Sequence, residues 1–316
     1  MTQSSDSEDT VLTSDDAFAV LGNETRIQIL RTLGETDEPL SFTEVRERVG
    51  IRQGAQFNYH LNKLVGHFVQ KTDEGYELRR PGRRVIEAVL SGAITDDPSV
   101  APTSVDFECR LCSASLKLSY TQEQVELYCT GCAGQYDEIG KPRNPDAPED
   151  HGWLGGYNLP PAGIRGRSPA EILQTASLWT HLAFIAWGND VCPRCSATVE
   201  QTLRVCEGHD TLDGLCPKCD RRHAVQLTSR CTNCGATMEG LFGNHLMKSP
   251  QLRSFVADHG IDPITDGVEW GWDYEEEVLS SDPFKARFTY TVDGETLTLT
   301  VDDNLEITDA SRGEPK

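Results

Sequence analysis

The stretch VCPRCSATVEQTLRVCEGHDTLDGLCPKCDRRHAVQLTSRCTNC, residues 191–234, decides the fold of the second half of the chain. It holds three C-x-x-C pairs and one C-x-x-H pair, and a turn of this kind directs two side chains toward one ion. Two further C-x-x-C pairs flank residues 113–128. The chain therefore offers enough candidate ligands for up to three four-coordinate structural zinc ions. They are Cys109, Cys112, Cys129, Cys132, Cys192, Cys195, Cys206, His209, Cys216, Cys219, Cys231 and Cys234.

Disulfides are the competing interpretation of so many cysteines. The first 16 residues are polar and acidic, which is not typical of a secretory signal, so we expect a reducing, cytoplasmic setting in which thiols persist. A thioredoxin-like redox motif needs one C-x-x-C pair, whereas this chain has five. No apolar run reaches the ~18 residues of a membrane helix, so no membrane partner is expected.

The spacing of the pairs predicts how they combine. Residues 113–128 read as two alternating stretches around a polar turn, which returns the second pair beside the first and predicts a zinc ribbon. Residues 196–205 and 220–230 contain no Gly, Pro or Asn, and each reads as one strand. Ten extended residues separate their ends by roughly 33 Å, so neighbouring pairs would not share an ion.

We therefore predict a nested arrangement for the later ligands, with a turn at residues 210–214. One zinc would lie at the base of a long hairpin, and another at its tip. The base ligands would be Cys192, Cys195, Cys231 and Cys234, and the tip ligands Cys206, His209, Cys216 and Cys219. Sequential pairing is the alternative.

Residues 15–92 read as helices followed by a short hairpin. Residues 17–33 carry apolar residues at a helical period, and Ser41 to Glu44 is a capping box that opens a helix through Val49. Residues 53–67 form the next expected helix, residues 68–71 and 76–79 a two-stranded ribbon, and Pro81 opens a last helix through Leu90. This order is typical of a winged helix-turn-helix.

In such a fold the third helix enters the major groove of double-stranded DNA. Its outward side chains are amides, aromatics and cations, which suit phosphates and base edges, and further cations lie on and after the ribbon. A solvated helix face is the alternative for the arginine cluster. The candidate DNA-binding residues are Arg52, Gln53, Gln56, Asn58, Tyr59, His60, Lys63, Lys71, Arg79, Arg80, Arg83 and Arg84.

The charge of the chain is distributed unevenly. Its 316 residues carry 29 Lys and Arg against 50 Asp and Glu, a formal net charge of −21. Residues 15–92 hold 11 cations and 12 acids and are nearly neutral, so the acidic bias is relaxed in the one segment expected to meet phosphate. Acidic, lysine-poor sequence is typical of a halophile, because concentrated salt screens self-repulsion. An ordinary acidic protein is the alternative.

Three stretches carry a family resemblance: LGNETRIQILRTL, SFTEVRERVGI and QFNYHLNKLVGHFVQKTDEGYEL. They resemble the ArsR-like winged-helix regulators of haloarchaea, and the cysteine-rich remainder looks like the zinc-ribbon region often fused to that domain. The resemblance implies a transcription regulator that binds DNA through residues 52–63 and the wing. Heavy-metal sensing by the helical domain is not expected, because no cysteine precedes Cys109.

The whole chain is predicted to be α+β. We expect a disordered acidic tail (1–14), the winged helix (15–92), a linker (93–106), the zinc ribbon (107–138), a loop and buried helix (139–190), the double zinc hairpin (191–245) and an α+β region (246–310).

Within those segments, residues 139–167 are expected as loop, and the helix from Pro169 to about Trp187 is apolar nearly all round, which predicts burial in a core or at a dimer interface. A helix from Pro250, strands 284–292 and 295–301 around Asp293-Gly294, and a third strand at 305–307 complete the region. For residues 270–277 we favour aromatic packing beside a solvated acidic turn, and a ligand pocket is the alternative.

A DNA-binding regulator with structural zinc is the favoured function. The alternatives are a zinc or thiol redox or metal sensor, and an adaptor that binds nucleic acid or protein. A zinc enzyme is least favoured, because the twelve ligands make three complete four-ligand shells with no open coordination position, and no catalytic motif is present. A homodimer is expected only from the habits of the fold, and the sequence does not identify a small-molecule ligand.

Overall fold

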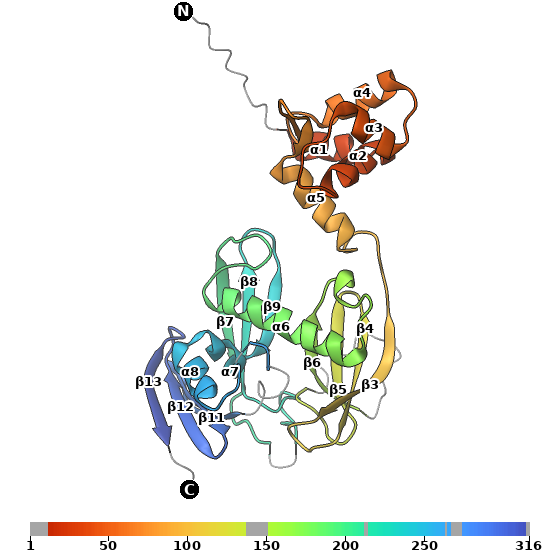
Figure 1. Ribbon diagram of the computed structural model, residues 1–316. Helices are drawn as coiled ribbons and strands as arrows, with labels where there is room; N and C mark the ends of the chain where they lie inside the picture. The colour runs from red at the N-terminus through yellow and green to blue at the C-terminus, as the bar shows by residue number, and fades with distance from the viewer. Residues whose placement is uncertain (1–11, 137–150, 212–213, 263, 267–273, 314–316) are drawn as a thin grey trace, which may run out of the picture. The chain divides into compact units, whose positions relative to one another are not determined.

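The computed structural model describes residues 12–136, 151–211, 214–262, 264–266 and 274–313 (Figure 1). The chain divides into two compact units, Met1–Asp96 and Asp97–Lys316. Both mix helices with antiparallel strands, so the predicted α+β class is confirmed. In the described part of the chain, no helix combines the length and the apolarity that a bilayer crossing demands.

The first unit contains helices followed by a two-stranded antiparallel hairpin. Its core gathers around α2 and α4, where Ile29, Leu30, Phe57, Leu61 and Leu64 are fully buried. The elements are α1 (Ser14–Leu21), α2 (Glu24–Gly34), α3 (Phe42–Val49), α4 (Gly54–Leu64), β1 (Val69–Lys71), β2 (Tyr76–Leu78) and α5 (Arg80–Leu90).

Local capping signals set most of these helix boundaries. The capping box of α3 is confirmed, because Ser41 accepts from the Glu44 N–H while the Glu44 carboxylate accepts from the Ser41 N–H. The single helix read over residues 17–33 is wrong. The chain turns at Gly22, and Asn23 caps a second helix by accepting from the Arg26 N–H.

Two other predictions at the edges of this unit need correction. The helix expected through residue 67 ends at Leu64, because Val65 turns to an extended conformation and bridges to Val69 at the start of the hairpin. The expected acidic tail reaches residue 14, yet Ser14 already opens α1, with Thr13 as its cap. Residues 1–11 of that tail lie outside the described residues.

The second unit is built on three small antiparallel sheets with helices between them. The first sheet comprises β3 (Val100–Glu108), β4 (Ser115–Thr121), β5 (Gln124–Cys129) and β6 (Gly152–Asn158), and the second β7 (Val199–Val205), β8 (Val225–Cys231) and β9 (Thr237–Leu241). The third comprises β10 (Tyr274–Ser281), β11 (Phe284–Val292), β12 (Glu295–Val301) and β13 (Ile307–Gly313). The helical segments are η1 (Pro161–Gly163), α6 (Pro169–Gly188), α7 (Phe242–His245), η2 (Leu246–Lys248) and α8 (Pro250–Asp258).

The first sheet corrects two predictions. The segment read as a linker, residues 93–106, contributes most of β3, and the segment read as loop, residues 139–167, contributes β6. Both strands pair with the predicted β4–β5 hairpin, β3 with β4 and β6 with β5. The apolar content of both strands is low, and β6 pairs with a strand distant in sequence, so no local pattern identified them. Residues 137–150 lie outside the described residues.

The strands of the second sheet are shorter than predicted. β7 begins at Val199 and β8 at Val225, because the turns after Cys195 and Cys219 occupy the residues before them. The expected tip turn at residues 210–214 falls partly outside the described residues.

The third sheet contains the predicted hairpin of β11 and β12, with its turn at Asp293 and Gly294. The third strand was expected at 305–307, whereas β13 starts at Ile307 and runs beyond residue 310 to Gly313. Residues 275–277, read as an acidic turn, are part of β10, an edge strand whose Glu275 and Glu277 side chains face solvent. Trp270 and Trp272 lie outside the described residues.

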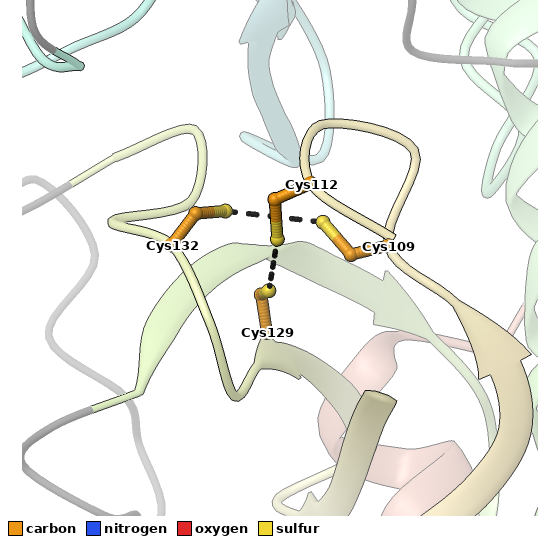
Figure 2. Close-up of side chains that lie close together, drawn as sticks. All are labelled: Cys109, Cys112, Cys129 and Cys132. Atoms are coloured by element: carbon orange, nitrogen blue, oxygen red, sulfur yellow. Dashed lines mark hydrogen bonds between the residues drawn. The ribbon is translucent and has the colours of Figure 1, made fainter. Parts of the chain in front are cut away.

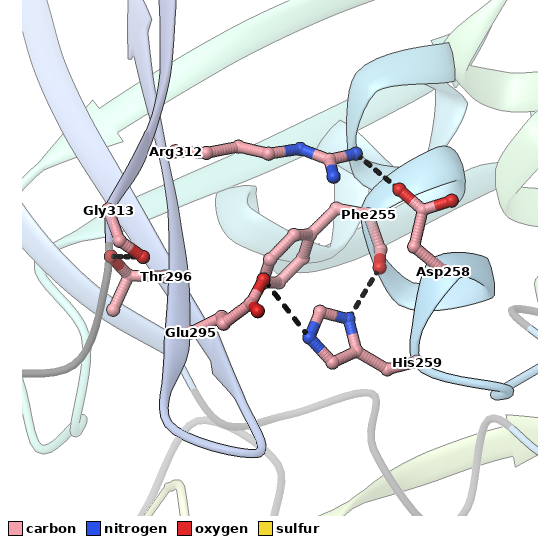
Figure 3. Close-up of polar contacts among 7 residues, drawn as sticks. All are labelled: Phe255, Asp258, His259, Glu295, Thr296, Arg312 and Gly313. Carbon is pink, nitrogen blue, oxygen red and sulfur yellow. Dashed lines mark hydrogen bonds and ion pairs between the residues drawn. The ribbon is translucent and has the colours of Figure 1, made fainter.

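Helix α8 is fastened to the third sheet by polar contacts (Figure 3). Arg312 on β13 pairs with Asp258 at 2.7 Å and lies over the Phe255 ring. His259 Nε2 lies 3.5 Å from a carboxylate oxygen of Glu295, while Nδ1 donates to the Phe255 carbonyl oxygen at 2.8 Å. These contacts hold the helix over the buried apolar face of the sheet.

Helix α6 opens with the predicted capping box of Ser168 and Glu171. One of its faces is buried against the first sheet and against η2, with Leu173 and Ala176 completely enclosed. The expected burial in a core is confirmed for this face alone, and burial at a dimer interface stays a prediction. Trp179 and Leu182 on the opposite face are 53% and 48% exposed.

Candidate metal centres

The twelve predicted ligands come together in three groups of four. In each group the ligand atoms all lie within 4.8 Å of one another. The groups are the ribbon group (Cys109, Cys112, Cys129, Cys132), the base group (Cys192, Cys195, Cys231, Cys234) and the tip group (Cys206, His209, Cys216, Cys219). The later ligands therefore have the nested arrangement, not the sequential one.

The ribbon group has the geometry of a tetrahedral thiolate shell (Figure 2). The turn after β3 supplies Cys109 and Cys112, and the end of β5 and the turn beyond it supply Cys129 and Cys132. The Sγ atoms of Cys109 and Cys132 are 3.8 Å apart, and those of Cys112 and Cys129 are 3.4 Å apart. Four sulfurs bound to one zinc at ~2.3 Å are separated by about 3.8 Å. The four side chains fit that ion.

The base group repeats this geometry on the second sheet. The Sγ distances are 3.7 Å between Cys192 and Cys234 and 3.4 Å between Cys195 and Cys231. Trp187 at the end of α6 is buried against Cys192 and Cys231 in a small apolar cluster. The long helix therefore ends on the base group, a role for Trp187 that its apolar pattern did not reveal.

The tip group contains a histidine that is already oriented for a metal. His209 Nε2 lies 3.0 Å from the backbone oxygen of Arg222, and a carbonyl oxygen only accepts, so Nε2 carries the proton. The unprotonated Nδ1 then faces the Sγ of Cys219 at 3.5 Å. A metal-binding histidine characteristically donates its other ring N–H to such an acceptor.

The turns that carry the ligands share a backbone conformation. The residue after the second cysteine has a positive φ in four of the C-x-x-C turns, at Ser113, Ser196, Asp220 and Gly235. This left-handed step turns the chain back, so that the N–H of each first cysteine donates to a carbonyl five residues on, as from Cys109 to Ala114 and from Cys192 to Ala197. Backbone N–H groups inside the turn then donate to sulfur, for example from Asn233 to Cys231 at 3.4 Å.

The thiols of the three groups differ in acidity. The N–H of Ala197 and the amide of Asn233 lower the pKa of Cys195 to about 6, and the N–H of Asp210 lowers the pKa of Cys216 to about 6. Burial instead raises the pKa of Cys132 to about 11 and that of Cys219 to about 12. A bound cation would displace the protons from these buried thiols with raised pKa values, so metal uptake should release protons.

The candidate DNA-binding residues all lie in the first unit. Their side chains are exposed or half-buried, and within the described residues none of the cations among them forms an ion pair. Arg52 and Gln53 precede α4, and five others lie along it: Gln56, Asn58, Tyr59, His60 and Lys63. Lys71 ends β1, and Arg79, Arg80, Arg83 and Arg84 gather at the start of α5.

Two family models match the sequence. One, described as a domain of unknown function (DUF7351), covers residues 106–307, which is more than half of the chain. The chain belongs to the DUF7351 family. A second model, also described as a domain of unknown function (DUF7347), covers residues 14–89. No curated protein and no solved structure matches the chain.

The DUF7351 region contains every ligand of the three groups, from Cys109 to Cys234, together with α6 and α8. The DUF7347 match ends at residue 89, within α5, and so falls inside the first compact unit. The candidate metal centres therefore belong to one family region and the candidate DNA-binding residues to the other.

Proposed function

We propose that the three groups hold structural Zn²⁺ ions. The Sγ separations of 3.4 to 3.8 Å and the His209 tautomer set by Arg222 support tetrahedral coordination by sulfur and nitrogen, which is the chemistry zinc prefers. Each shell is complete with four protein ligands, so no coordination position is left for a substrate. The ions act as staples for small sheets, not as catalysts.

We further propose that the protein is a transcription regulator that binds double-stranded DNA through its first unit, as a winged helix-turn-helix. The resemblance to ArsR-like haloarchaeal regulators supports this reading. Helix α4 acts as the recognition helix, and the β1–β2 hairpin as the wing. In this proposal the second unit is a rigid region of the regulator, and its small sheets are stabilised by zinc.

The observation that carries the DNA proposal is a contrast among the helix N-termini of the first unit. Helices α1, α2 and α3 are each capped by a side chain and carry an acidic residue in the first turn. Helices α4 and α5 have neither, and arginines flank both starts. Uncapped N–H groups and the positive end of the helix dipole attract phosphate. Acidic side chains in the first turn would repel phosphate, and α4 and α5 have none there.

The outer face of α4 supplies the means to discriminate bases. Gln56 and Asn58 are exposed amides, which donate to and accept from base edges, while the inner residues of the helix are buried in the core. Tyr59 is exposed, with the Lys63 ammonium 5.9 Å from its ring centre, so both side chains stand together on the outer surface.

Immunoprecipitation of the protein with its bound DNA across the source genome tests the proposal. We expect discrete enriched sites that share a sequence, and loss of these sites in an Arg83→Glu, Arg84→Glu variant that keeps its metal. Uniform recovery of DNA, unchanged by the substitutions, would contradict it.

A further inference from the structure

The exposed face of α6 stands out on the surface of the second unit. Four large apolar side chains of this unit are substantially exposed within the described residues, namely Trp179, Leu182, Val191 and Leu279. Three of them lie on α6 or just after it. Single exposed apolar residues are ordinary, whereas a cluster marks a contact surface.

The spacing of this face is that of a helix seam. Leu178, Leu182 and Ile185 follow one another at intervals of four and three residues, with Trp179 beside them. Alternating steps of three and four keep side chains on one line along a helix, and such a line packs against a second helix of the same kind. Leu178 and Ile185 are half-buried at the edges of the exposed strip.

Charge identifies the occupant. Residues 172–189 contain no Asp, Glu, Lys or Arg, in a chain with a net charge of −21. Burial lowers the pKa of His181, the one titratable side chain in this stretch, so the helix stays neutral between Glu171 and Asp190. A basic partner would be drawn to the acidic surfaces elsewhere. A second copy carries the same −21, and only a neutral strip lets two such chains approach.

We propose that α6 is a self-association surface through which two copies of this chain pair in antiparallel fashion about a two-fold axis near Leu182. That residue lies within one turn of the midpoint of the neutral stretch, and an antiparallel pairing sets the positive N-terminal end of each helix dipole beside the negative C-terminal end of the other. The seam is short, about 27 Å at 1.5 Å per residue, so the dimer is modest in affinity. The inference does not depend on DNA binding.

Salt distinguishes this contact from an ionic one. Added salt screens the repulsion between the two acidic chains and strengthens apolar burial, so dimerisation increases with salt. An interface held by ion pairs weakens under the same change. Light scattering coupled to gel filtration of the zinc-loaded full chain, at 0.2 and 2 M KCl, measures this directly.

The decisive variants change one leucine. Leu182→Glu and Leu182→Lys each place like charges together at the axis, so each alone should be monomeric. An equimolar mixture of the two should recover the dimer, which also shows that both variants are folded. Leu279→Glu is the matched control, because Leu279 is 39% exposed on β10, and it should remain dimeric.

Three results would overturn the proposal. A wild-type chain that is monomeric at every salt and protein concentration shows that the face is not a self-interface. A dimer that survives Leu182→Glu places the contact elsewhere. Monomeric single variants that stay monomeric when mixed, with full zinc content, show that α6 is covered by something other than a second α6.

Discussion

The Arg222 side chain donates from Nε to the backbone oxygen of Gly134, 3.2 Å away, and so joins two candidate metal centres. Gly134 lies two residues beyond the ribbon ligand Cys132. The Arg222 N–H also donates to the Gln135 oxygen at 3.0 Å, while the Arg222 oxygen accepts from the tip ligand His209. One residue thus contacts the backbone of the ribbon group and the imidazole of the tip group, so the two sites should be coupled.

Loss of the tip ion should weaken the ribbon site. In a Cys216→Ser, Cys219→Ser variant we expect the zinc affinity of the ribbon group to fall about 5- to 150-fold, the range of typical site-to-site coupling. Alkylation of each cysteine, mapped by mass spectrometry during a chelator titration, reports the sites separately. Cys195→Ser, Cys234→Ser removes the base ion instead and is the control. Equal weakening by both variants would show general destabilisation, not coupling.

His209→Cys separates the ion from the hydrogen bond. The variant keeps four ligands and should still bind three ions, but it lacks the N–H that reaches the Arg222 oxygen. We expect the tip site to load while the ribbon site behaves as though the tip were empty. Cobalt substitution confirms loading of the tip, because a shell of three thiolates and one imidazole absorbs differently from a shell of four thiolates. Retention of wild-type ribbon affinity would refute this route of coupling.

The Nε hydrogen bond of Arg222, and not its contribution to the net charge, should support the zinc affinity of the ribbon group. Arg222→Ala removes the Nε contact and leaves the backbone contacts in place, which should lower the ribbon affinity by about tenfold, as expected for loss of one charge-assisted hydrogen bond. Arg230→Ala, on the exposed side of β8, is the control and should change little. The same alkylation titration measures both. A similar loss in the two variants would assign the effect to net charge.

Local signals in the sequence predicted much of this structure. The C-x-x-C turns, the capping boxes at Ser41 and Ser168 and the Asp293-Gly294 turn each depend on residues within five positions, and the structure has all of them. The nested grouping followed from the length of extended chain between pairs. These features need no knowledge of distant partners.

The failures concern features that are decided by partners outside the segment itself. In β3 only Val105 is buried, so the strand exists because β4 pairs with it and not because of its own pattern. In β10 the acidic side chains alternate between the two faces of the strand, and Glu276 faces inward. Composition alone predicted a solvated turn here. The Arg222 contacts join segments 88 residues apart, which no local pattern marks.

The inward position of Glu276 predicts a dependence of stability on pH. Its carboxylate accepts from the N–H groups of Ala224 and Val225, and burial raises its pKa to about 7 from an ordinary 4.5. The folded state therefore holds this proton more tightly than the unfolded state. The Glu276 contribution to stability is full at low pH, falls as pH rises from about 4.5 to about 7, and then levels off.

Glu276→Gln should remove that dependence. A glutamine oxygen still accepts both N–H groups but carries no charge, so between pH 6 and pH 8 the wild type should lose about 1 kcal/mol relative to the variant. Urea unfolding with saturating zinc at both pH values measures the difference. Glu275→Gln, an exposed neighbour on the same strand, should follow the wild type. Parallel pH profiles for the wild type and Glu276→Gln would contradict the assignment.

Under the proposed function, reversal of the charges at the start of α5 should weaken binding to every DNA sequence alike. Arg83→Glu with Arg84→Glu removes two phosphate contacts, so affinity should fall at least about tenfold and the slope of log affinity against log salt should decrease by about two. Arg204→Glu with Arg230→Glu, on the exposed side of β7 and β8, changes the net charge equally and should have a much smaller effect. Fluorescence anisotropy with operator and scrambled duplexes measures both slopes. If the two arginine pairs have equal effects, bulk charge and not docking by α5 governs the affinity.

Substitution of the exposed amides of α4 should instead change sequence preference. In Gln56→Ala or Asn58→Ala, the difference in binding free energy between operator and scrambled DNA should shrink by ~1–3 kcal/mol, since amides read base edges.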